Sequence, residues 1–272
     1  MFALAVALSC ALPVRAQTIL GMWDFADPAK SEQRFRDALA HASGDWRLEL
    51  ETQVARTYSL RGRYAEAHRL LDEIEPQLAT AGVKPRLRYM LERGRILNSA
   101  GHKSAAEPLF VQAGRLAEEA GEDDLAIDAA HMVAIVAGGE RALDWNRRAL
   151  AMAQKARDPA AKRWKASVLN NMGVELNELG RHEEALAVFE RALDAYRERG
   201  EPRDIRIARW MIAHTLRLLG RNEEALKMQL ALERELTAAG EVDPHVREEL
   251  AALYAALGEP VKARDFATPA GR

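Results

Sequence analysis

The sequence predicts an all-α protein, a right-handed α-α superhelix of about six helix pairs with an amino-terminal half-repeat. Three observations lead to this prediction. Ala, Leu, Glu and Arg are abundant while strand-forming patterns are scarce, a composition that favours helix. A Gly followed five residues later by Ala recurs along the chain. The recurrence has a nearly constant period, and residues with helical hydrophobic spacing fill each interval.

The recurring Gly and Ala have a mechanical reason. A Gly that ends a helix adopts the left-handed conformation that costs other residues strain. The Ala five residues later lets the next helix pack closely against the preceding one. Glu between them suits the positive end of the helix dipole. The pairs are Gly62/Ala67, Gly101/Ala106, Gly180/Ala185, Gly220/Ala225 and Gly258/Ala263.

Aligning the repeats on the small residue that opens each second helix shows the period. The aligned residues lie 36 to 43 positions apart and are Ala67, Ala106, Ala142, Ala185, Ala225 and Ala263. The predicted first helices are 46–61, 85–100, 122–137, 163–179, 203–219 and 244–257. The predicted second helices are 64–80, 103–120, 139–156, 182–199, 222–239 and 260–268. One further helix, 28–42, is expected to cover the first full repeat, as the ends of solenoids require.

The stretch LGRHEEALAVFERALDAY, residues 179–196, places His182 beside Glu183 and Glu184 and raises the question of a metal or acid/base site. The repeats argue against it. The same slot holds Tyr64, Lys103, Asn222 and Pro260 in other copies, and these residues do not share one chemical role. His182 is therefore interpreted as a turn residue.

Charge and cysteine content restrict the partners and the chemistry. The net charge of −2 gives no overall attraction to nucleic acid or to an acidic membrane. The one cysteine, Cys10, permits no internal disulfide and no cysteine-built zinc site. The sequence shows no nucleophile elbow, phosphate-binding glycine loop or paired zinc ligands. No metal or cofactor is expected, and the chain is predicted not to be an enzyme.

The first residues resemble a secretory signal. They are apolar from Phe2 to Val14, and Val14-Arg15-Ala16 suits signal peptidase, although no Lys or Arg precedes the apolar run. The predicted layout is a signal peptide at 1–16, an amino-terminal segment with the half-repeat helix at 17–45, and the solenoid at 46–268. An uncleaved anchor or a buried first helix is the alternative. Localisation is expected to be periplasmic or secreted, without stable membrane insertion after cleavage.

One copy, LNNMGVELNELGRHEEALAVFERAL, closely resembles a tetratricopeptide repeat. It supplies the large, small and aromatic residues of that family's pattern, namely Leu169, Met172, Gly173, Leu176, Gly180, Ala185, Phe189 and Ala192. The third copy departs most, with Gly138 and Gly139 at its turn and Asn146 where the family has an aromatic residue. Repeats near forty residues are similar to the elongated variety found in kinesin light chains and many bacterial proteins.

The resemblance implies that the first helices line a concave groove that binds an extended peptide or a partner helix. Asn and Arg can hydrogen-bond a peptide backbone or a carboxylate, and Trp is a common interface anchor. Helix-to-helix packing is the alternative role for Trp210. The candidate groove residues are Arg56, Arg88, Arg95, His131, Asn170, Asn171, Asn177, Trp210, His214 and Arg217.

Three functional hypotheses follow. The first is a non-enzymatic scaffold that binds another protein or a peptide in the groove. The second is a peptide or signal sensor of the same repeat type. The third is an enzyme whose site is assembled across several helices. Nucleic acid is not an expected partner, and self-association into an oligomer is left open.

Overall fold

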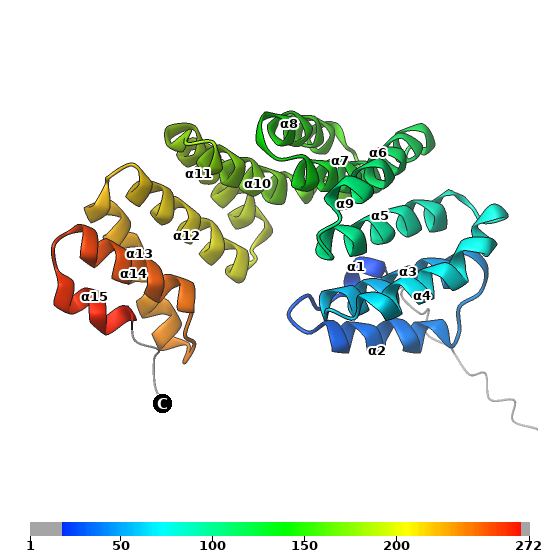
Figure 1. The fold of residues 1–272 in the computed structure, drawn as a ribbon, viewed down its shortest axis with the longest axis horizontal. Helices are drawn as coiled ribbons and strands as arrows, with labels where there is room; N and C mark the ends of the chain where they lie inside the picture. Colours follow the sequence, from blue (N-terminus) through cyan, green and yellow to red (C-terminus); the bar gives the residue numbers. More distant parts are fainter. Residues whose placement is uncertain (1–17, 268–272) are drawn as a thin grey trace, which may run out of the picture. The chain divides into compact units, whose positions relative to one another are not determined.

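The computed structural model describes residues 18–267, and all regular secondary structure in that range is helical (Figure 1). The chain divides into two compact units, Met1–His102 and Lys103–Arg272. We call their described parts the amino-terminal unit, 18–102, and the carboxyl-terminal unit, 103–267. The predicted signal peptide lies outside the described residues. Within them, no helix is both long and apolar enough to span a bilayer.

The amino-terminal unit is built around one central helix. That helix, α3, contacts α2, α4 and α5, so three neighbours cover it. Phe35 of α2 is fully buried against Leu50 and Val54 of α3. Leu71 and Ile74 of α4 belong to a second core cluster, which contains other residues of α3. The helices are α1 (Ile19–Met22), α2 (Pro28–Leu39), α3 (Gly44–Leu60), α4 (Tyr64–Ile74), the 3₁₀ helix η1 (Glu75–Ala79) and α5 (Val83–Ser99).

In the carboxyl-terminal unit, long helices pack in chain order, and each long helix contacts the long helix before and after it. One core cluster, which includes Leu143, Leu169 and Phe189, runs through most of the unit. The helices are α6 (Lys103–Ala120), α7 (Asp123–Ala137), α8 (Gly139–Lys155), α9 (Pro159–Lys162), α10 (Trp164–Glu178), α11 (His182–Arg199), α12 (Pro202–Leu218), α13 (Asn222–Ala238), α14 (Pro244–Ala256) and α15 (Pro260–Ala267).

The turns within the helix pairs form as the Gly–Ala pattern predicts. Gly180 and Gly220 have φ angles of 73° and 75°, in the left-handed region that a side chain would strain. After Gly180, the main-chain N–H of Arg181 donates back to Leu176 at 2.8 Å, which closes the end of α10. Ala185 and Ala225, which follow these turns, are fully buried.

Close packing of α10 against α11 depends on another glycine, Gly173, which lies within α10. A Cβ atom built on Gly173 would lie 2.5 Å from a ring carbon of Phe189, too close for the ring to stay in place. Phe189 is fully buried, so α10 and α11 approach each other through this glycine. The predicted helix-pair architecture is therefore confirmed, with boundaries within a few residues of those expected.

Four details differ from the prediction. The second helix after Tyr64 ends at Ile74 and continues as η1, because Pro76 cannot donate an α-helical hydrogen bond. Asp158-Pro159 starts a separate short helix, α9, before α10. The short helix α1 was not anticipated. The last aligned alanine, Ala263, is only half-buried because α15 has no later helix among the described residues to cover it.

Candidate functional site

The candidate groove residues of the amino-terminal unit surround two buried carboxylates. Glu49 and Glu92 are 8% and 2% exposed and lie on α3 and α5. Arg88 donates to Glu49 at 2.7 Å, and Arg95 donates to Glu92 at 2.6 Å. Arg56 forms an ion pair with Glu92 at 3.7 Å. Glu92 therefore holds two guanidinium groups and Glu49 holds a third.

Two aromatic residues beside this cluster were not predicted. The Trp23 indole N–H donates to Gln53 at 3.0 Å, and Phe25 stacks on Trp23 with ring centroids 4.8 Å apart. The Arg56 guanidinium lies 5.1 Å from the Trp23 ring and 5.4 Å from the Phe25 ring. Phe25 is 51% exposed. The two aromatic residues of Trp23-Asp24-Phe25 are visible in the sequence, but they precede the first full repeat and do not belong to the repeat pattern.

In the carboxyl-terminal unit the candidate residues connect successive first helices. The His131 ring on α7 lies 3.4 Å from the Asn171 amide on α10 and 5.2 Å, between centroids, from the Trp164 ring. The Trp164 indole N–H donates to Asp124 of α7 at 2.8 Å. The amide oxygen of Asn170 is buried and has no hydrogen-bond partner among residues 18–267. α7 and α10 are therefore joined by polar side chains along this face.

The next contact joins α10 to α12 and also explains His182. The Asn177 amide donates to the Thr215 hydroxyl at 2.7 Å. The His182 ring nitrogen lies 3.0 Å from the other amide atom of Asn177. Glu184 pairs with Arg181 instead of His182. His182 thus begins α11 and orients Asn177. No group of three or more metal-ligating side chains occurs within 18–267.

The last contact joins α12 to α14 through a buried carboxylate. Glu249 is 5% exposed and contacts His214 at 3.1 Å and Arg217 at 2.6 Å. Burial raises the pKa of the Glu249 carboxyl, but the hydrogen bonds from His214 and Arg217 outweigh it, so the pKa lies below its ordinary value. Trp210 stacks on His214 with centroids 5.1 Å apart and donates to the His245 carbonyl at 3.1 Å.

Because these contacts of the carboxyl-terminal unit recur between neighbouring first helices, we call them together the first-helix seam. The structure pairs the predicted His131 with the predicted Asn171. It also joins predicted residues to Thr215 and Glu249, which were not predicted and lie about one repeat away along the chain. Polar residues of complementary type spaced by one period were the signal for them. The seam of the carboxyl-terminal unit consists of Asp124, His131, Trp164, Asn171, Asn177, Trp210, His214, Thr215, Arg217, His245 and Glu249.

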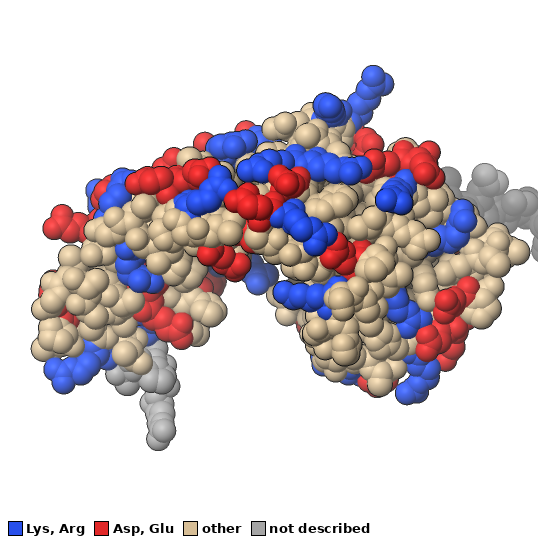
Figure 2. Space-filling view, turned by 45° about the horizontal axis from the view of Figure 1, so that its top comes forward, with Lys and Arg blue, Asp and Glu red and all other residues tan. Residues whose placement is uncertain are grey.

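The second helices present a different surface. In the view of Figure 2, basic and acidic side chains alternate and do not gather into separate patches. Arg148 of α8 contacts Glu118 of α6 at 2.6 Å, and Arg181 contacts Glu140 of α8 at 2.9 Å. Within each pair the two charges neutralise each other. The first-helix seam is the better candidate for recognition.

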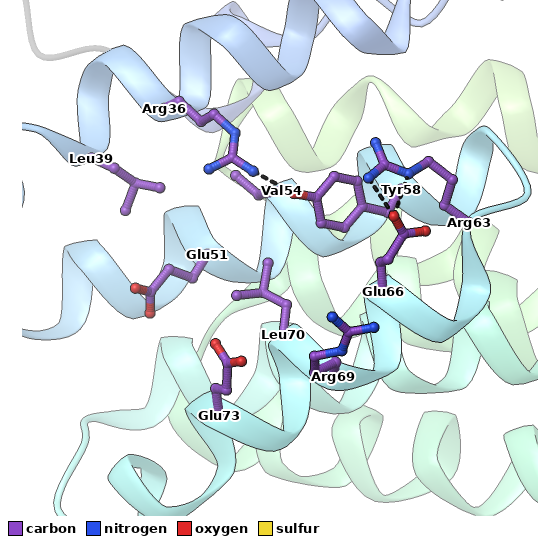
Figure 3. Close-up of a pocket in the computed structure, with 10 residues that line it drawn as sticks. All are labelled: Arg36, Leu39, Glu51, Val54, Tyr58, Arg63, Glu66, Arg69, Leu70 and Glu73. Atoms are coloured by element: carbon purple, nitrogen blue, oxygen red, sulfur yellow. Dashed lines mark hydrogen bonds and ion pairs between the residues drawn. The ribbon is translucent and has the colours of Figure 1, made fainter.

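A cavity of about 340 Å³ lies in the amino-terminal unit, lined by α2, α3 and α4 (Figure 3). Leu39, Val54 and Leu70 form its apolar part. Figure 3 shows Glu51 and Glu73 on one side, away from Arg63. Burial, followed by repulsion from Glu73, raises the pKa of Glu51 despite its pairing with Arg47. The cavity offers both charge signs to a ligand.

A larger cavity of about 710 Å³ lies in the carboxyl-terminal unit beside the first-helix seam. It is lined by α12, the end of α13, the turn after α13 and the start of α14. Trp210 packs between helices, as the alternative role foresaw, and it also lines this cavity.

Comparison with known proteins supports the repeat assignment. The family model for the tetratricopeptide repeat matches residues 132–198 and 164–234. No curated protein has a significant sequence match to the chain.

Three solved structures share the fold. The first is a signal transduction ATPase with numerous domains from Pyrococcus horikoshii, which has a tetratricopeptide repeat sensor. It is 14% identical to this chain with a TM-score of 0.68, and the alignment covers 88% of this chain and 38% of that chain. A putative kinesin light chain of Podosopora anserina has 18% identity and a TM-score of 0.57, covering 72% and 98%. NprR, solved with its cognate peptide NprX, has 16% identity and a TM-score of 0.58, covering 91% and 74%.

At these identities the structural similarity establishes the fold alone. The chain spans well under half the length of the Pyrococcus horikoshii protein, so the activity of that whole protein does not transfer to it. The family match over 132–234, the helix pairs with glycine-ended first helices, and the shared fold agree with one another. Residues 132–234 of this chain are tetratricopeptide repeats, and they lie within a series of helix pairs that has the same fold.

Proposed function

We propose that the chain is a non-enzymatic scaffold that binds a protein or peptide along its first-helix seam. The observation that carries the proposal is the seam itself. It is a row of half-exposed amide, imidazole and guanidinium groups on successive first helices, held in place by one another. Such groups can donate to and accept from a peptide main chain, and Arg can pair with a carboxylate.

A sensor of peptide signals is the second candidate. The observation that favours it is the fold shared with NprR, whose solved complex contains its cognate peptide NprX. Scaffold and sensor use the same surface, and they differ in whether ligand binding changes the state of the protein. Hydrogen exchange of the full chain with and without its ligand separates them, because a sensor changes protection far from the seam.

The remaining assignments belong to the same proposal. We place the protein in the periplasm or outside the cell, as the apolar first residues suggest. Its partner is another protein or a peptide and not nucleic acid, since the face seen in Figure 2 carries mixed charges. The protein works without a metal or a cofactor, and self-association is compatible with the proposal.

The test is partner capture followed by measured affinity. The tagged full chain is used to capture partners from periplasmic extract, and the captured partner is then titrated by calorimetry into the Asn171→Ala and Trp210→Ala variants. Truncation of an interface anchor typically costs about 2 kcal/mol in binding, roughly thirtyfold in affinity. Glu190→Ala, an exposed position on α11, is the matched control and should change affinity little.

Melting curves for each variant show whether it is still folded. Equal losses of affinity in the seam variants and in Glu190→Ala would contradict the proposal. If the ligand carries carboxylates, binding to the wild type should also weaken as salt concentration rises.

A further inference from the structure

The 710 Å³ cavity exists because α14 starts one turn late. α12 begins at Pro202, 18 residues before Gly220, whereas α14 begins at Pro244, 14 residues before Gly258. The difference of four residues is about one helical turn. Asp243 sets the late start, since its side chain accepts a hydrogen bond from the His245 N–H at 2.9 Å. The first turns of α12 therefore lack a covering first turn of α14.

The uncovered surface is apolar. Ile207 on α12 is 41% exposed, and Val242 in the turn before α14 is 59% exposed. Trp210 lies between the seam and the cavity and packs against the core cluster that contains Leu232. The volume falls within the range of about 300–1,000 Å³ typical of ligand sites. The cavity can accept a large aliphatic or aromatic side chain.

The residues that line the cavity include an arginine that is in no ion pair within 103–267. Arg206 pairs with Glu241 at 3.2 Å, and Asp243 is occupied with the start of α14. Arg203, which also lines the cavity, is exposed and has no ion pair among the described residues. Both acidic side chains that line the cavity, Glu241 and Asp243, therefore have a partner in the protein, whereas the Arg203 guanidinium can pair with a ligand. A ligand carboxylate beside the apolar group would complement it.

The turn also presents main chain to the cavity. Asp243 is extended, with φ −111° and ψ 112°. Within 103–267, no hydrogen bond is found for the main-chain N–H of Val242 or of Asp243. An extended peptide can pair with such a segment through its own main chain, in the manner of strand addition. A lipid or a simple aromatic acid has no matching row of N–H and C=O groups, which favours a peptide.

We propose that this cavity binds a peptide segment whose large apolar side chain lies between Ile207, Trp210 and Val242 and whose neighbouring carboxylate pairs with Arg203. The inference rests on the scaffold proposal and gives it a ligand class. The peptide main chain lies along the turn before α14. The cavity opens next to the seam, so a peptide on the seam can extend into it.

The experiment uses two blocked peptides, acetyl-Gly-Glu-Phe-Leu-Gly-amide and acetyl-Gly-Lys-Phe-Leu-Gly-amide, titrated into the full chain. The readout is the nuclear magnetic resonance signal of the Trp210 indole N–H, which Trp210→Phe identifies among the five tryptophans. We expect the acidic peptide to give a saturable shift with about tenfold higher affinity than the basic peptide. Arg203→Glu should remove that preference or reverse it.

Two further variants complete the test. Val242→Trp fills the cavity from an exposed position and should abolish the shift, while Arg191→Glu, exposed on α11 and outside the cavity, should change nothing. Absence of a saturable shift with the acidic peptide, equal affinity of the two peptides, or unchanged binding in Val242→Trp each overturns the proposal.

The two proposals can fail separately. If the acidic peptide does not bind while Asn171→Ala still loses the captured partner, the cavity assignment is wrong and the scaffold assignment stands. If the peptide binds as expected while partner affinity is unaffected by Asn171→Ala and Trp210→Ala, the seam assignment is wrong.

Discussion

Two buried amides occupy a position that aromatic residues fill elsewhere in the repeats. Gln229 and Asn146 lie four residues after Ala225 and Ala142, as Phe189 does after Ala185. Gln229 is fully buried and Asn146 is 2% exposed. Neither the amide nitrogen nor the oxygen of Gln229 finds a hydrogen-bond partner among the described residues. A buried polar group without a partner costs about 1–3 kcal/mol, so the fifth helix pair carries a local weakness.

Replacing this amide should stabilise the protein. Gln229→Leu should raise the free energy of unfolding by about 1–3 kcal/mol, because it removes the unpaired amide and keeps a similar volume. Urea denaturation followed by circular dichroism measures the change. Gln112→Leu, at an exposed position of α6, is the matched control and should stay within about 0.5 kcal/mol of wild type. A loss of stability in Gln229→Leu would show that the amide has a partner after all.

Glu249 should make stability depend on pH in acid. Its folded pKa lies below its ordinary value, because hydrogen bonds from His214 and Arg217 outweigh the effect of burial. Its contribution is therefore complete above the unfolded pKa and is lost as the pH falls through the folded pKa. The stability difference between wild type and Glu249→Gln should shrink as the pH is lowered from 7 to about 3.

Urea denaturation at a series of pH values measures this difference. Glu190→Gln, which changes an exposed carboxyl on α11, should show a much smaller pH dependence relative to wild type. A difference between wild type and Glu249→Gln that stays constant through the acidic range would mean that the carboxylate is not held by its two partners.

At the scale of helices, the crossing of α10 and α11 has little room for change. Ala185 is fully buried at this crossing, and Phe189 approaches the main chain of α10 at Gly173. Because the two helices are in close contact here, an added methylene group would force the backbone to shift. The alanine and the glycine therefore have the same role, which is to let two helices come close.

Ala185→Leu should overpack this crossing and lower the free energy of unfolding by about 1–3 kcal/mol. Ala187→Leu places the same side chain on the exposed face of α11 and should have little effect. Chemical denaturation of both variants measures the contrast. Equal stability of the two variants would argue against a tightly packed crossing.

Helix length decides where the larger cavity opens. α14 has 13 residues and α12 has 17, and the missing turn is at the start of α14. The sequence around 240–244, with Gly240, Asp243 and Pro244, marks this late start because Asp before Pro is a strong helix beginning. The resulting cavity depends on the packing of α12, α13 and α14 and was not predicted.

At the scale of the whole molecule, the prediction that concerns the first residues is open to a direct test. If residues 1–16 are a cleaved signal, protein purified from the native host should begin near Gln17 and lack Cys10. Intact mass and a thiol assay measure both consequences. Soluble cytoplasmic protein that retains Met1 would overturn the proposed localisation.

The sequence by itself determined the helix pairs, their turns and most of their boundaries. These depend on local interactions, because a helix is closed by hydrogen bonds four residues apart and ended by a glycine at a known offset. It also placed Asn177, Trp210 and His214 on first helices. The short helices α9 and η1 were not predicted. Each begins at or next to a proline, Pro159 or Pro76, which changes the local helix without changing the period of the repeats.

Only the tertiary structure decided what those side chains contact. Glu249 meets His214 and Arg217, and Thr215 meets Asn177, across a separation of about one repeat. Such contacts depend on the crossing angle and register of neighbouring helices, which small residues such as Ala185 and Gly173 set through packing. Hydrophobic periodicity identifies the face of a helix but carries no information about which polar group stands opposite it, and for that reason the seam and the cavity emerged only from the folded chain.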